Sequence, residues 1–152
     1  MILLIIATSF LFGSVLTNLY ITQALTQAII ASGLGKWTMM VLINLFLLVL
    51  GCLMPPVAII LIVAPIILPI ITAYGFDPIW FGVVMTINME VGLITPPVGL
   101  NLYIVQGIAP TVPLSRVLMG SLPFVIILLL GIVILSVWPD LAMWLPSKMI
   151  TR

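Results

Sequence analysis

The chain has 152 residues, of which 64% are hydrophobic and 5% are charged. This composition leaves too little polar surface to cover a soluble domain, so the sequence predicts an integral membrane protein. It contains no histidine and one cysteine, Cys52, which excludes a His/Cys metal cluster, a disulfide within the chain and the His-dependent catalytic sets. Four basic and three acidic residues provide no basic patch for nucleic acid.

The N-terminal region predicts two helices. Residues 1 to about 18 are apolar and form the first segment. The following stretch, 20–32, has apolar and polar residues on opposite faces of a helix, which predicts a helix lying in the membrane interface. The alternative is an ordinary extension of the first span. The first residues lack the basic leader of a secretory signal, so we interpret them as a span entered partway through or as the start of a truncated chain.

The stretch between Lys36 and Asp77 has forty residues without a charge and contains four prolines. A spanning helix needs about 20 apolar residues to cross a hydrocarbon core roughly 30 Å thick. Pro55 and Pro56 divide the stretch into two arms, 37–54 and 57–72, each on the order of 25 Å long. We therefore predict a re-entrant hairpin whose tip stops inside the membrane. Irregular backbone at that depth must be buried in protein or line a wet cavity, so the tip indicates a binding site.

A second interrupted segment runs from about residue 80 to residue 107 and contains the sequence GLITPPVGLN. Its glycines and prolines predict two half-helices on either side of a gap, with Thr95 and Pro96 extended. A last ordinary span is expected from about 118 to 138, followed by an interfacial tail. The chain accordingly divides into four segments: a spanning and an interfacial helix (1–35), the hairpin (36–76), the discontinuous helix (77–110), and the final span with its tail (111–152).

A broken helix brings the positive end of one half-helix and the negative end of the other to the same place. Carbonyl and hydroxyl oxygens there can hold a small cation, and amides can hold a carboxylate. Two discontinuous elements in a short chain indicate an ion-coupled secondary transporter, with proline kinks filled by packing as the alternative. The candidate metal-binding residues are Gly51, Cys52, Met54, Pro55, Thr95, Pro97, Gly99 and Asn101, and the candidate substrate-binding residues are Thr95, Pro96 and Asn101.

Glu90 is an acid placed well inside an apolar segment. An intramembrane carboxylate indicates a function by default, because burying it costs about 3 kcal/mol or more. Glu90 can bind a proton, help to hold a cation, or support the coordinating loop together with Asn88 and Gly92. The alternative is a carboxylate that faces a polar cavity and has only a supporting role. Cys52 is interpreted as an inert, small apolar residue.

Residues 51–110 closely resemble the end of the large membrane subunit of TRAP transporters, the tripartite ATP-independent periplasmic family. The resemblance runs through the two prolines of the second hairpin arm, the G-F-D-P and F-G-V turns, and the motif G-L-I-T-P-P-V-G-L-N. It extends more loosely over the whole chain. It implies a sodium-driven, multi-pass elevator transporter of the bacterial inner membrane, without an organic cofactor. Such a transporter takes organic acids, often dicarboxylates or sialic acid, from a periplasmic binding protein and works with a small membrane subunit.

By this resemblance the sodium-binding loops of the family fall on 51–55 and 95–101. One departure is that the family often has an acidic or small polar residue at the hairpin tip, where this chain has Met54 and Pro55. Transporters of this kind have two inverted halves, each with a hairpin and a broken helix, and this chain has one of each. We therefore expect the C-terminal third or so of the large subunit, an all-α fold that needs the missing N-terminal part to transport.

Two other functions are weighed against transport. A small membrane assembly or pore protein would not need two broken helices. An intramembrane aspartyl protease needs two carboxylates that share one site within the membrane. Asp77 and Asp140 both lie at segment ends beside prolines, where solvated interface positions suit them better. We therefore expect that the chain is not an enzyme and that its surroundings are the lipid bilayer and its protein partners.

Overall fold

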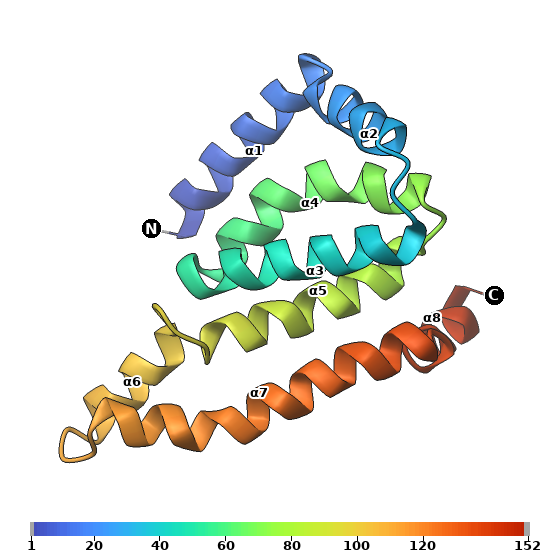
Figure 1. Cartoon of the computed structure of the whole chain (residues 1–152). Coiled ribbons are helices and arrows are strands. Elements are labelled where there is room, and N and C mark those ends of the chain that lie inside the picture. The colour runs from blue at the N-terminus through green and yellow to red at the C-terminus, as the bar shows by residue number, and fades with distance from the viewer. Residues whose placement is uncertain (1, 151–152) are drawn as a thin grey trace. The chain divides into compact units, whose positions relative to one another are not determined.

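The computed structural model describes residues 2–150, and every regular element in that range is a helix (Figure 1). In chain order these are α1 (Ile2–Asn18), α2 (Ile21–Ala31), α3 (Lys36–Leu53), α4 (Pro56–Ala73), α5 (Pro78–Leu93), α6 (Leu100–Ile108), α7 (Leu114–Val137) and α8 (Asp140–Ile150). Within the described range, α3, α4 and α7 are long and apolar enough to cross a membrane. The predicted all-α membrane fold is confirmed.

The helices group into two compact units, each of which is described by itself. One unit combines Met1–Ile43 with Met54–Pro78, and the other combines Asn44–Leu53 with Ile79–Arg152. The first half of α3 therefore belongs to the first unit and its second half to the second.

In the first unit, α4 packs against both α1 and α2. The chain turns between α1 and α2 at Tyr20, whose φ of 56° lies in the left-handed region. This turn excludes the alternative in which 20–32 simply extends the first span. In α2 the side chain of Thr22 is buried, whereas Ile21 and Leu25 are exposed. Thr26 is half-buried on the same side, whereas Gln23 and Gln27 are exposed, so part of the polar face packs on protein.

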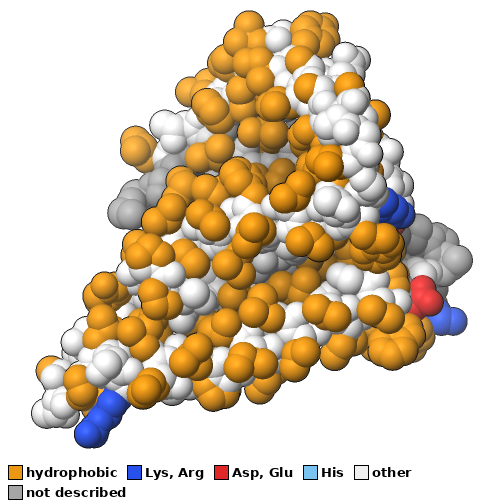
Figure 2. All heavy atoms as spheres, in the orientation of Figure 1, with side chains coloured by type: hydrophobic (Ala, Val, Ile, Leu, Met, Phe, Trp, Pro, Cys, Tyr) orange, Lys and Arg blue, Asp and Glu red, His pale blue; other side chains and the backbone are white. Residues whose placement is uncertain are grey.

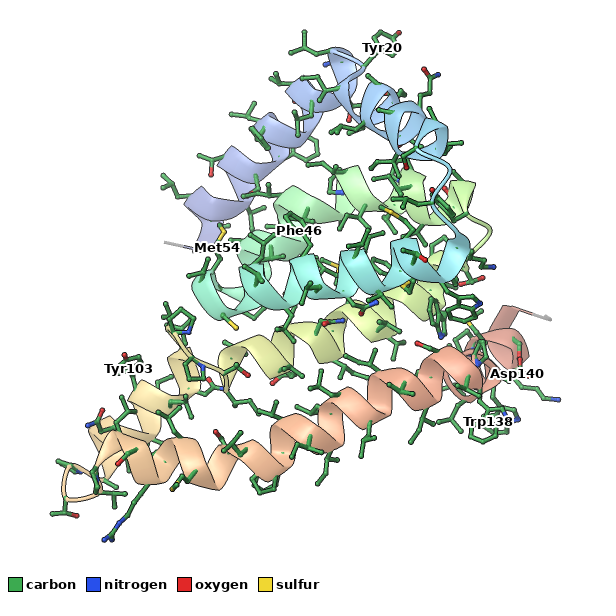
Figure 3. The ribbon with its side chains drawn as sticks, viewed as in Figure 1. Tyr20, Phe46, Met54, Tyr103, Trp138 and Asp140 are labelled. Carbon is green, nitrogen blue, oxygen red and sulfur yellow. The ribbon has the colours of Figure 1, made fainter. Side chains whose placement is uncertain are left out.

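The helices α3 and α4 form a hairpin that is closed at its base. A two-residue turn that includes Met54 joins them (Figure 3). At the other end, Lys36 Nζ donates to the carbonyl oxygen of Gly75 at 3.1 Å and lies 4.2 Å from the ring centroid of Phe76. The Trp37 ring packs edge-on against the same Phe76 ring, with centroids 5.8 Å apart. The start of α3 and the end of α4 therefore lie side by side.

The turn after α4 places the Phe76 ring. The N–H of Phe76 donates to the carbonyl of Ile71 at 3.1 Å, and the N–H of Gly75 donates to that of Thr72 at 2.9 Å. This pair of bonds is a Schellman motif, in which the residue after the helix is left-handed. Gly75 has a φ of 73°, a conformation that glycine adopts without steric cost. The glycine thus allows the ring to turn back onto the start of α3.

In the second unit, α7 is the longest helix and packs against α6 and α8. It begins at Leu114, earlier than the predicted start near 118, because Pro113 adopts the extended conformation that precedes a helix. Apolar side chains cover the visible face of α7 (Figure 2), and most of its large apolar side chains are exposed. A helix that is apolar all round and exposed in this way suits contact with lipid or with other membrane helices.

Trp80 ties the start of α5 to the end of α7. Its side chain is 2% exposed, and its indole Nε1 donates to the carbonyl oxygen of Leu135 at 2.8 Å. Within a helix that carbonyl would be bonded by the N–H of residue 139, but Pro139 has no N–H to donate. The indole therefore satisfies a carbonyl that the sequence leaves without a helical partner.

Replacing Trp80 by phenylalanine keeps an aromatic ring and removes the donor. The unpaired Leu135 carbonyl costs on the order of 1–3 kcal/mol, so Trp80→Phe should lower the thermal midpoint of the purified protein in detergent by a few degrees. Trp144→Phe is the matched control, because Trp144 is 66% exposed. Equal midpoints for the two variants would show that the indole bond contributes nothing to stability.

Candidate functional site

The interrupted helix breaks at residues 94–99, between α5 and α6. The N–H groups of the first two residues after α5 donate to carbonyls of its last turn, each at 3.3 Å. We expected Thr95 and Pro96 to be extended. Instead, Thr95 lies at a bend and residues 96–98 form turns, with a cis peptide between Pro96 and Pro97. Residues 94–99 therefore form a compact loop, the break loop.

Gly99 starts α6 in the left-handed region, with φ of 48° and ψ of 65°. A Cβ at this position would be strained by the positive φ and would lie 2.7 Å from Leu102 Cδ1 and 3.1 Å from the Thr95 carbonyl oxygen, so glycine is favoured here. A glycine has no side chain with which to cap the first amides of α6. The N–H of Leu102 donates to the Gly99 carbonyl oxygen at 2.8 Å, whereas those of Leu100 and Asn101 have no acceptor within the helix. Asn101 is half-buried in the same first turn.

The C-terminal end of α3 lies against this loop. The carbonyl oxygen of Cys52 accepts a hydrogen bond from the N–H of Val98 at 3.3 Å. Gly51 and Gly92 cross backbone to backbone, because a Cβ at Gly92 would lie 2.6 Å from Gly51 Cα. The structure therefore brings the predicted residues Gly51 and Cys52 to the break.

A pair of amides, of which Asn88 is buried and Asn44 is half-buried, joins α3 and α5. Asn88 is 1% exposed, and its Nδ2 donates to Asn44 Oδ1 and to the carbonyl oxygen of Val84, the latter at 3.1 Å. Asn88 was predicted to support the site, whereas Asn44 was missed. Its signal was present in the sequence, because a lone amide in an apolar arm is typical of hydrogen bonding between membrane helices.

The remaining predicted residues lie elsewhere. Glu90 is exposed on α5, whereas Asn88, two positions earlier, is buried. Residues two positions apart lie on nearly opposite faces of a helix, so Glu90 does not share the amide-bonded face. Met54 and Pro55 are exposed in the turn between α3 and α4 and belong to the first unit. Asp140 starts α8, just beyond Trp138 (Figure 3).

The chemistry of the loop suits a hard cation. Thr95 Oγ1 donates to the Val91 carbonyl oxygen at 2.5 Å, which leaves the lone pairs of the hydroxyl free to accept. The C-terminal ends of α3 and α5 contribute carbonyl oxygens and partial negative charge, and the start of α6 contributes amides and partial positive charge. Between residues 2 and 150 no three His, Cys, Asp or Glu side chains gather. A cation here would therefore rest on backbone and hydroxyl oxygens, and the sulfurs of Cys52 and Met54 would not suit it.

Comparison with known proteins gives a consistent result. Residues 1–141 match the family model described as the DctM component of the tripartite ATP-independent periplasmic transporter. The chain is 41% identical over 97% of its length to the C4-dicarboxylate TRAP transporter large permease protein DctM of Vibrio cholerae, and 42% identical over 97% to that of Pseudomonas aeruginosa. It is 31% identical over 97% to the sialic acid TRAP transporter permease protein SiaT of Haemophilus influenzae. It covers 32%, 34% and 24% of these relatives, so it spans about a third of their length or less.

The crossing of Gly51 and Gly92 is tested by adding a methyl group to α5 at one of two glycines, Gly92 or Gly82. At Gly92 an added Cβ meets the backbone of Gly51, which cannot move aside as a flexible side chain can. Overpacking of this kind costs about 1–3 kcal/mol or more, so Gly92→Ala should lower the yield and thermal midpoint of the purified protein. At Gly82, on the same helix, an added Cβ has nothing within 4 Å. Gly82→Ala should therefore match wild type, and identical behaviour of both variants would contradict the crossing.

Proposed function

Because the chain belongs to the DctM family of tripartite ATP-independent periplasmic transporters, we propose that it forms part of a sodium-coupled permease that imports organic acids. This family comprises transport permeases rather than enzymes, and the resemblance stated from the sequence is confirmed. The names of the relatives include C4-dicarboxylate and sialic acid, which share a carboxylate group. Because the chain spans about a third of these relatives, transport requires the rest of the permease.

This proposal rests on one observation: in the second unit the ends of α3 and α5 meet the start of α6. The crossing of Gly51 and Gly92 and the bond from Val98 to Cys52 bring the carbonyl ends of α3 and α5 to the amide end of α6. Carbonyl ends favour a cation, and an amide end favours a carboxylate. When two opposite charges bind next to each other, each lowers the free energy of binding of the other, which is a coupling between ion and substrate.

In this proposal the oxygens of Thr95 and the loop carbonyls around Pro97 and Gly99 coordinate sodium. The N–H groups of Leu100 and Asn101 and the side chain of Asn101 hold the carboxylate of the substrate, beside Thr95 and Pro96. Asn88 and Gly92 act indirectly, because they hold α5 against the end of α3. Glu90 is exposed on α5, where it is available to the remaining helices of the permease.

We further propose that the α3–α4 hairpin is re-entrant in the bacterial inner membrane. Each arm has 18 residues, about 27 Å at 1.5 Å per residue, against a core of about 30 Å. Lys36 and Trp37 at the closed base are residue types that suit a membrane interface. Met54 at the tip has no oxygen in its side chain, so sodium binding falls on the break loop and on the carbonyls of Gly51 and Cys52.

The partners in this proposal are the small membrane subunit and a periplasmic substrate-binding protein. The family description, a tripartite periplasmic transporter, supports both. The exposed apolar side chains of α7 offer a surface to lipid and to neighbouring membrane helices. A pore or assembly protein, the competing function, would show uptake that does not depend on sodium.

Sodium coupling is tested by removing the Thr95 hydroxyl. In the complete transporter in proteoliposomes, Thr95→Val keeps the shape of the side chain, and the sodium concentration for half-maximal uptake should rise about tenfold. Thr86→Val is the control, because Thr86 makes the same kind of bond to a carbonyl four residues earlier but is exposed on α5. If Thr95→Val is present at normal abundance and its sodium dependence is unchanged, this hydroxyl is not part of the coupling site.

The depth of the hairpin tip is tested by cysteine labelling. In a Cys52→Ala background, Met54→Cys should react slowly with a membrane-impermeant maleimide added from either side, because the tip lies within the membrane. Ser32→Cys, exposed between α2 and α3, is the control and should react rapidly from one side. Rapid labelling of Met54→Cys from the side opposite to Ser32→Cys would mean that both arms cross the membrane completely.

A further inference from the structure

A hydroxyl of α7 reaches the break in the interrupted helix. Ser121 Oγ lies 3.3 Å from the carbonyl oxygen of Ile94 and 2.8 Å from that of Leu118. Ile94 is the first residue after α5, and its carbonyl belongs to the peptide unit that leads into Thr95. A bond to this oxygen therefore restrains the orientation of the peptide plane immediately before Thr95. The sequence alone indicated only an ordinary span at this position.

The two acceptors of Ser121 differ in kind. The Leu118 carbonyl lies in the same helix, whereas the Ile94 carbonyl lies in the loop. One hydroxyl has one proton, so it donates fully to one of them at a time. When the loop moves, the hydroxyl keeps its partner within α7, and only the Ile94 carbonyl must find another donor or ligand. The bond can therefore form and break without leaving a buried donor unsatisfied.

The packing around this bond is loose. A cavity of about 190 Å³ separates the loop from α7 and is lined by Ile94, Thr95 and Pro96 on one side and by Leu118, Ser121 and Leu122 among others on the other. Thr95 and Ser121 contribute its polar side chains, and the Thr95 hydroxyl donates to the Val91 carbonyl of α5. A cavity supplies few packing contacts. The hydrogen bond of the Ser121 hydroxyl therefore links α7 to the loop.

We propose that Ser121 is a positioning residue for the break loop, and that it acts through the carbonyl of Ile94. This inference rests on the sodium coupling proposed above. By holding the peptide before Thr95, Ser121 reduces the number of loop conformations that must be ordered when the ion binds. Because ordering a loop on binding costs affinity, loss of this bond weakens sodium binding and leaves the maximal rate largely intact.

Three variants of α7 test the proposal in the complete transporter in proteoliposomes. Ser121→Ala should raise the sodium concentration for half-maximal uptake about 2- to 10-fold, the range expected for one hydrogen bond. Ser121→Thr keeps the hydroxyl, and the cavity has room for its methyl group, so this variant should remain near wild type. Ser136→Ala is the control, because the Ser136 hydroxyl donates within α7 to the Ile132 carbonyl at 2.7 Å.

Hydrogen exchange gives a second readout that does not depend on sodium. Amides of residues 94–101 should exchange faster in Ser121→Ala than in wild type or Ser136→Ala. Unchanged exchange would overturn the inference, and so would an unchanged sodium requirement in Ser121→Ala when wild type is sodium-dependent. If wild-type uptake shows no sodium dependence, the proposed function fails, and the exchange comparison then decides by itself whether Ser121 holds the loop.

Discussion

The backbone crossing of α3 and α5 at Gly51 and Gly92 is the contact on which the rest of the second unit depends. An added Cβ at Gly92 would lie 2.6 Å from Gly51 Cα, so any side chain there would push the helices apart. With the helices at this separation, the Cys52 carbonyl can accept the bond from Val98 in the loop. Backbone groups left without partners in a membrane cost several kcal/mol. The crossing therefore both packs two helices and satisfies the irregular backbone beside them.

The break loop is held by a few hydrogen bonds, and its packing against α7 is loose. The Cys52 carbonyl and the Ser121 hydroxyl hold it from outside, and the Thr95 hydroxyl holds it from within. The cavity beside α7 leaves part of the loop without packing partners. A loop restrained in this way can exchange one polar partner for another at low cost, since each net hydrogen bond is worth about 1 kcal/mol. This property suits a segment that must order around an ion and then release it.

The hairpin is organised differently, with polar and aromatic contacts at its base. The Lys36 ammonium, the Phe76 ring and the Trp37 ring close the end at which α3 starts and α4 stops. Two prolines lie inside α4 without ending it, although each removes a backbone donor. The packing of α1 and α2 on α4 covers part of this helix, and a Cβ added at Gly13 of α1 would lie 3.8 Å from Pro65 Cγ, in ordinary van der Waals contact. Neighbouring helices thus support a helix that its own sequence weakens.

The sequence by itself determined where most of the helices stop and start, because proline and glycine act through local covalent geometry. The predicted arms, 37–54 and 57–72, agree closely with α3 and α4, and the predicted break coincides with 94–99. Which helix faces meet was decided only by the tertiary structure. Asn44 and Asn88 are 44 residues apart, and Ser121 and Ile94 are 27 apart. On helices that are apolar all round, no periodic pattern marks the face that packs. The rotation of α5 that buries Asn88 and exposes Glu90 accompanies the backbone contact of α3 and α5 at Gly51 and Gly92, which brings together residues far apart in the sequence.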